Sequence, residues 1–113
     1  MNRWDVYWAD VPFEDDPTQG KCRPVIIAKD AAVYVLTLRV TTHSPRECDP
    51  YDYQLTEWQF ANLPSPSVVR IRKIAQLSPE KIHDYIGRLH PADQLGIQIK
   101  MDEYRIERNR LRK

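Results

Sequence analysis

The stretch from Gly20 to Ala28 holds an arginine in a setting that suits anion binding. It reads GKCRPVIIA, in which a polar, flexible approach ends at Arg23 and Pro24 fixes the backbone that follows. The three apolar residues after Pro24 are typical of a strand buried on both faces. A guanidinium at the mouth of a rigid strand is a preorganised fork for a phosphate or a carboxylate. A surface arginine before an edge strand is the competing interpretation.

A second group of polar side chains follows along the next strand. Residues 33–42 read VYVLTLRVTT. A two-residue period places the large apolar residues on one face and three polar residues on the other, namely Thr37, Arg39 and Thr41. The polar face is either the wall of a groove or plain solvent-exposed surface.

Composition limits the class of protein. The chain has 113 residues, 42% of them apolar, and this suits one domain over residues 1–113 with one core. Because the formal net charge is only +1, any contact with nucleic acid must come from a local patch. No apolar run approaches the roughly 20 residues of a membrane span, and the N-terminus lacks a signal-peptide pattern. We therefore expect a cytoplasmic protein.

The sequence shows none of the common metal or cofactor motifs. Cys22 and Cys48 lie in predicted loops without the spacing of metal ligands. No glycine-rich phosphate loop, Ser-His-Asp order or HExxH motif occurs. We expect a reduced protein with no metal and no cofactor, and a disulfide between the two cysteines stays open.

Periodicity and turn residues predict the elements that position these groups. Strands are expected over residues 4–11, 24–28, 33–42, 51–55, 67–77 and 84–89. Thr56–Gln59 has the form of a capping box, which predicts a helix of one or two turns that carries Trp58 onto the core. Ser78 followed by Pro79 predicts a single helical turn.

The last segment predicts a long helix. It runs from His90 to about Arg110, with apolar residues at helical spacing and Gly96 as its weak point. Short strands with small inserted helices and this final helix predict a mainly β (α+β) fold, a small curled barrel with a helix packed on it.

The order of these segments resembles the PemK/MazF family of toxins from type II toxin–antitoxin systems. The resembling pieces read WDVYWADVPF, GKCRPVIIA, a strand ending RVTT, EWQFANLPSPSVVRIRKIAQL and IGRL, and they cover nearly the whole chain. The resemblance implies an SH3-like barrel and a homodimer that binds single-stranded RNA near the dimer interface. It also implies metal-independent endoribonuclease activity and neutralisation by an antitoxin protein with a disordered tail.

Individual residues match the family pattern to different degrees. The arginine of the R-P pair is Arg23, and the threonine that closes the third strand is Thr41, with Thr42 beside it. The strand after S-V-V matches at Arg70. The position that is often acidic in related sequences holds Arg72 here.

The implied chemistry can be assigned to candidate side chains. Metal-free RNA cleavage uses the 2′-OH as nucleophile and needs a base, an acid and donors for charge at phosphorus. Arg23 would stabilise that charge, although a guanidinium is a poor base. Thr41 would hold a phosphate oxygen or the 2′-OH. The expected base is His43, which titrates in the right range, with Asp10 and Glu14 as alternatives.

Other residues are expected to bind or to be structural. The residues expected to follow the RNA backbone are Lys21, Arg39, Thr42, Arg70, Arg72 and Lys73. His83 and His90 are expected to be structural. The three tryptophans could stack on bases, although core packing is the simpler use of Trp4, Trp8 and Trp58.

Two other functions stay open. A catalytically silent barrel that binds RNA or a protein partner is favoured by Arg72 in place of an acid. A toxin-like module directed at a protein such as a topoisomerase is the other, because a related toxin family has the same fold.

Overall fold

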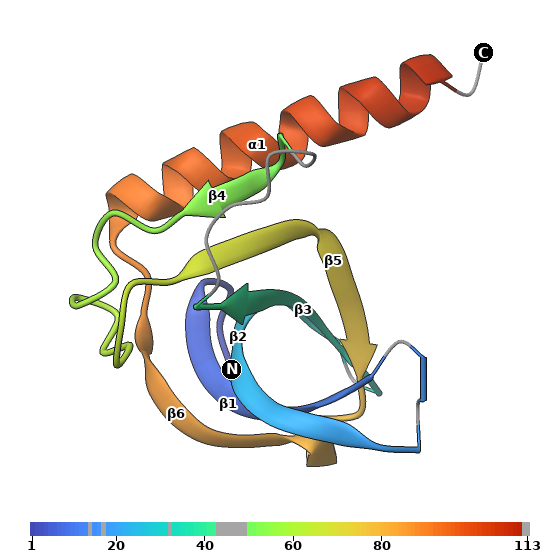
Figure 1. Ribbon diagram of the computed structural model, residues 1–113, viewed down its shortest axis with the longest axis vertical. Coiled ribbons are helices and arrows are strands. Elements are labelled where there is room, and N and C mark those ends of the chain that lie inside the picture. The colour runs from blue at the N-terminus through green and yellow to red at the C-terminus, as the bar shows by residue number, and fades with distance from the viewer. Residues whose placement is uncertain (14, 17, 32, 43–49, 112–113) are drawn as a thin grey trace.

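A curled antiparallel sheet makes up most of the structure (Figure 1). The computed structural model describes residues 1–13, 15–16, 18–31, 33–42 and 50–111. The described strands follow the order β4-β5-β3-β2-β1-β6 in the sheet. The elements are β1 (Asp5–Pro12), β2 (Gly20–Asp30), β3 (Val35–Thr41), β4 (Asp52–Gln54), β5 (Val68–Leu77), the 3₁₀ turn η1 (Pro79–Lys81), β6 (Ile82–Arg88) and α1 (Pro91–Leu111).

The predicted strands and the C-terminal helix all form, which confirms the mainly β fold class. The largest boundary difference is in β2, which begins at Gly20 rather than Pro24. The pairing of β1 with β2 continues to Pro12 opposite Gly20, so the polar approach to Arg23 is itself part of the sheet. Among the helices of the described chain, none has the length and apolar character of a membrane span.

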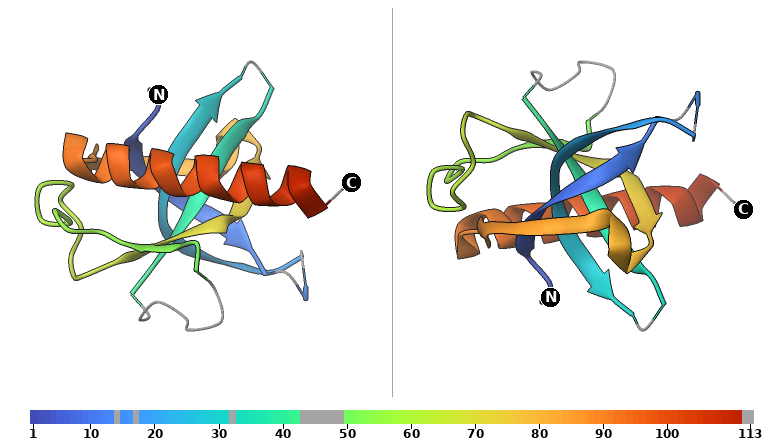
Figure 2. Two further views of the ribbon diagram at one scale, coloured as in Figure 1. Left: turned by 90° about the horizontal axis from the view of Figure 1, so that it is seen from above. Right: turned by 90° about the horizontal axis from the view of Figure 1, so that it is seen from below.

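The core lies between the sheet and α1, which crosses one face of it (Figure 2). Buried residues of β1, β2, β3 and β5 meet Ile97 of α1 there, and the cluster comprises Val6, Ile26, Leu38, Val40, Leu55, Ala61, Leu63, Val69, Ile71, Leu89 and Ile97. A smaller cluster holds Ala9, Val11, Val25 and Leu77. Burial of these aliphatic side chains is the main source of stability.

A register shift changes the expected faces of the third strand. Leu38 pairs with Ile74 of β5, whereas the next residue, Arg39, pairs with Arg70, so residues 71–73 lie between the two partners. Thr37 was expected on the polar face, but it is only 1% exposed and its hydroxyl donates to the Ala75 carbonyl over 3.2 Å. The polar face is therefore limited to the end of β3.

One buried carboxylate joins α1 to the loop between β4 and β5. Asp93 is 0% exposed and accepts hydrogen bonds from the Tyr53 hydroxyl (2.9 Å), the Thr56 amide (3.0 Å) and hydroxyl (2.8 Å), and the Glu57 amide (2.9 Å). The prediction of a helix at Thr56–Gln59 is therefore wrong, because the Thr56 hydroxyl donates to Asp93 instead of capping a helix.

Hydrogen bonds at this junction shift the pKa values of Asp93 and Tyr53. Burial by itself raises the pKa of Asp93, but the donors from Thr56, Glu57 and Tyr53 outweigh burial and the pKa is lowered. Burial and the bond to Asp93 raise the pKa of Tyr53 to about 12. The Tyr53 ring lies so close to α1 that a Cβ on Gly96 would sit 2.3 Å from its hydroxyl oxygen. The glycine that weakened the helix prediction thus makes room for Tyr53.

Candidate active site

Strands β2 and β3 part at one end and leave a wedge between them. Their pairing runs from Asp30 opposite Val35 to Val25 opposite Arg39, where the described ladder ends. Beyond that point β2 stays paired with β1, and β3 stays paired with β5. Because β2 continues along β1 and β3 continues along β5, the strands β2 and β3 diverge.

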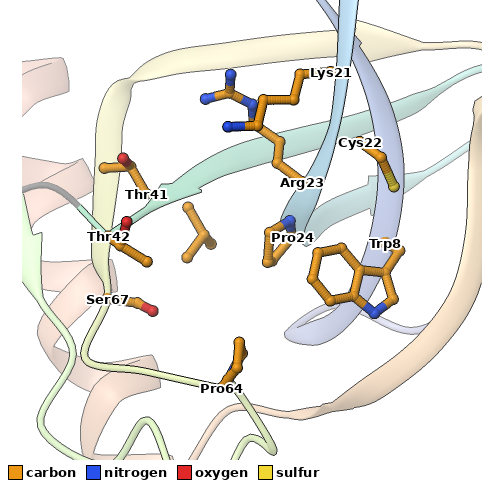
Figure 3. A pocket seen from close by; sticks show the side chains of 10 residues that line it. Trp8, Lys21, Cys22, Arg23, Pro24, Thr41, Thr42, Pro64 and Ser67 are labelled. Carbon is orange, nitrogen blue, oxygen red and sulfur yellow. The ribbon is translucent and has the colours of Figure 1, made fainter.

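A cavity of about 250 Å³ lies where these strands diverge (Figure 3). We name it the β2–β3 cavity, and its described lining is Trp8, Lys21, Cys22, Arg23, Pro24, Val40, Thr41, Thr42, Pro64 and Ser67. The structure therefore brings Arg23 and Thr41, far apart in sequence, to one site. Thr42 and Lys21, which were expected to bind RNA, lie there too.

Arg23 is poorly satisfied in this cavity. Its Nε is buried and has no hydrogen-bond partner among the described residues. Burial, and after it the positive charge of Arg39, lower the pKa of Arg23. None of the described lining residues is acidic, and Lys21 adds a second cation. An anion entering the cavity would supply the missing acceptor and offset the charge repulsion.

The other side of the cavity is apolar. Trp8 and Pro24 are opposite one another in the β1–β2 pairing, and both line the cavity together with Val40 and Pro64. In Figure 3 the side chains of Trp8, Pro24 and Pro64 lie away from the charged ends of Lys21 and Arg23. The sequence offered base stacking for Trp8 but favoured core packing, and only the pairing with Pro24 and the approach of the Pro64 loop place Trp8 in this cavity.

A second cavity holds three more of the cations that were expected to bind RNA. Arg39, Arg72 and Lys73 line it together with the half-exposed apolar side chains Phe13 and Ile74, and its volume is about 410 Å³. The Arg72 guanidinium also lies 5.9 Å from the centre of the Tyr104 ring, a cation–π distance. Arg39 is also the charge that acts on Arg23, so the cations of the second cavity lie within electrostatic range of the first.

Arg70 takes a structural position instead. It is 8% exposed and forms an ion pair with the buried carboxylate of Asp52 in the neighbouring strand β4. It lines neither the β2–β3 cavity nor the second cavity. The expectation that Arg70 follows the RNA backbone therefore finds no support in its position.

The candidates for the general base are only partly described. His43 and Glu14 lie outside the described residues, as does Cys48, so a pairing with the exposed Cys22 is not described either. Asp10 lies outside the lining of the β2–β3 cavity, and one of its carboxylate oxygens is 2.9 Å from Nε2 of His83 at the surface.

The other two histidines lie outside the lining of both cavities and contact other residues of the described chain. His83 forms the contact with Asp10 between β6 and β1. His90 accepts a hydrogen bond from the Ala92 amide at the start of α1, and its ring lies edge-on to Phe60.

Several solved structures share this fold. An endoribonuclease in complex with its cognate antitoxin from Mycobacterial species matches over 89% of this chain and 90% of its own, with a TM-score of 0.69 and 21% identity. The Mycobacterium tuberculosis toxin MazF-mt6 matches over 88% and 93%, with a TM-score of 0.69 and 18% identity. A second endoribonuclease from Mycobacterial species matches over 89% and 86%, with a TM-score of 0.67 and 20% identity.

These identities establish a shared fold and no more. No functionally curated protein matches the chain. The sequence itself matches a family over residues 2–103, and this span includes every described strand and most of α1. The chain belongs to the family of PemK-like, MazF-like toxins of type II toxin–antitoxin systems.

Proposed function

We propose that this protein is a toxin that cleaves single-stranded RNA as a metal-independent endoribonuclease, with the β2–β3 cavity as its active site. The observation that carries the proposal is the meeting of Arg23 and Thr41 in one cavity, with an unpartnered guanidinium nitrogen and no acidic side chain in the described lining. Family membership and the endoribonucleases of the same fold support it.

The geometry suits stabilisation of a charged phosphorus centre. Arg23 would donate to the non-bridging oxygens of the scissile phosphate, and Lys21 would add a second positive charge. The Thr41 hydroxyl would orient the phosphate or the attacking 2′-OH. Such groups act strongly because they are positioned before the substrate arrives and are partly shielded from water.

We assign the general base to His43. It follows Thr42, which lines the cavity, directly in the sequence, and an imidazole titrates near neutral pH. Asp10 is the weaker alternative because it lies outside the described lining and faces His83.

The second cavity offers a path for the rest of the RNA. Arg39, Arg72 and Lys73 would follow the phosphates on one side of the cut, and Lys21 and Thr42 would hold those beside it. Arg72 lies in the second cavity rather than beside Arg23, so this position serves substrate binding in our proposal.

The proposed partners are an antitoxin and a second copy of the chain. A protein of the same fold, solved with its cognate antitoxin, supports an antitoxin partner for this chain. The proposed location of both proteins is the cytoplasm. The exposed apolar side chains Leu95, Ile99 and Ile106 of α1 would suit contact in a homodimer.

The test is incubation of the purified protein with long single-stranded RNA in EDTA. Defined fragments with 2′,3′-cyclic phosphate ends are the expected result, since the 2′-OH is the nucleophile. Intact RNA with a mobility shift would favour a silent RNA-binding barrel instead. Intact RNA without a shift would favour a protein target.

A further inference from the structure

We infer that the β2–β3 cavity holds one unstacked nucleobase next to the scissile phosphate, and that Trp8 recognises this base. The inference rests on the proposed function and adds a determinant of cleavage specificity to it. Trp8 would hold the base through its ring and its indole N–H.

The first support is the division of the cavity into two chemically different sides. Lys21, Arg23 and Thr41 form a polar side that suits phosphate and ribose, whereas Trp8, Pro24 and Pro64 form an apolar side (Figure 3). A nucleotide has the same division, with a charged phosphate at one end and a flat, largely apolar base at the other. The sides therefore match the two ends of one nucleotide.

The second support is the state of the Trp8 side chain. It is half-buried, and its indole N–H donates to no residue of the described chain and is not among the buried atoms that lack a partner, so this donor is accessible to solvent. An indole N–H only donates, and an accessible one is free to donate to an acceptor on a bound ligand. A base edge carries acceptors, so a bound base would satisfy the donor while its face contacts the proline rings. The Ser67 hydroxyl is already engaged, because it donates to the Ser65 carbonyl over 2.8 Å.

The third support is size. At about 250 Å³ the cavity is smaller than the roughly 300–1,000 Å³ of a typical drug-sized ligand pocket. It has room for one base rather than a stack of bases. The remaining nucleotides would lie outside it, with their phosphates directed toward the cations of the second cavity.

The experiment compares Trp8→Phe with a matched control, Trp58→Phe. Both variants remove an indole, but Trp58 packs against the core and does not line the cavity. Each protein cleaves a pool of RNA with randomised sequence, and sequencing of the fragment ends gives the preference at each position around the cut. Melting curves confirm that each variant folds, and Trp8→Tyr replaces Trp8→Phe should the latter not fold.

The expected result is a loss of discrimination at one position. Among the fragments that Trp8→Phe still produces, the preference at a single position next to the cut falls by at least about threefold, as loss of one hydrogen bond predicts. Trp58→Phe leaves the profile unchanged. An unaltered profile in Trp8→Phe would overturn the inference and leave the proposed function intact.

A binding measurement decides the case in which the wild-type protein does not cleave. Short 2′-O-methyl oligonucleotides of adenine, cytosine or uracil are titrated while tryptophan emission is recorded. We expect quenching in the wild type and in Trp58→Phe, and its loss in Trp8→Phe. Trp8→Ala should weaken binding by about tenfold or more, because it also removes the apolar contact of the indole ring with the base. Equal quenching in Trp8→Phe, or no quenching by any oligonucleotide in the wild type, would refute the role of Trp8.

Discussion

Two charged side chains of this fold, Arg23 and Asp93, differ in how far other residues satisfy their hydrogen-bonding groups. Asp93 is fully buried and accepts four hydrogen bonds, which join α1 to the β4–β5 loop. Arg23 is half-buried in the β2–β3 cavity, and its Nε has no partner in the described chain. A satisfied charge stabilises the fold, whereas an unsatisfied one costs free energy that a ligand can recover.

The comparison predicts that replacing Arg23 lowers the rate of RNA cleavage but leaves the stability of the fold almost unchanged. Arg23→Ala should lower RNA cleavage by about a hundred- to a thousandfold, because it removes the principal donor to the phosphorus centre. The melting temperature should stay close to that of the wild type, since Arg23 forms no ion pair in the described structure. Cleavage that survives Arg23→Ala would place the active site elsewhere.

Arg70 should behave in the reverse manner. Arg70→Ala leaves the buried Asp52 carboxylate without its guanidinium partner and should cost about 3–5 kcal/mol of unfolding free energy. The control is Arg105→Ala, which breaks an exposed pair with Asp102 and should cost about 0–1 kcal/mol. Denaturant titration measures both, and a similar small loss in the two variants would mean that Asp52 is well satisfied by other groups.

The close contact at Gly96 predicts an intermediate loss of stability. In Gly96→Ala the new Cβ would meet the Tyr53 hydroxyl and ring at 2.3–2.6 Å, and Tyr53 is held by Asp93. We expect a net loss of about 1–3 kcal/mol from this overpacking, although alanine favours a helix by about 1 kcal/mol. A higher melting temperature in Gly96→Ala would show that Tyr53 moves aside at little cost.

The lowered pKa of Asp93 predicts a modest, pH-dependent effect. Because the folded pKa lies below the ordinary aspartate value, the stabilising contribution is complete above about pH 4 and is lost as the pH falls through the folded value. Asp93→Asn should therefore flatten the decline of stability between neutral and acidic pH. Asp84→Asn, at an exposed position, should leave the slope as in the wild type. An identical slope in both variants would contradict the assignment to Asp93.

Local sequence determined the strands and the helix of this protein and singled out Arg23 as a candidate site residue. Strand alternation and the apolar spacing of the last segment act over a few residues, so the strands and α1 were predictable, as was Arg23 at a rigid strand. The family followed from the order of motifs, and the family match confirms the family. The choice of Thr41 followed from the same order of motifs. The site roles of Arg23 and Thr41 stay predictions.

Tertiary structure decided which polar groups are satisfied and which are left for a ligand. The Thr56 hydroxyl donates to Asp93, 37 residues away, rather than to its own turn. Arg70 is neutralised by Asp52 across a strand pair. The divergence of β2 from β3 opens the cavity that contains Trp8 and Arg23. These outcomes depend on partners brought together by the register of the sheet, and local periodicity fixes the face that a side chain takes but not the residue that lies opposite it.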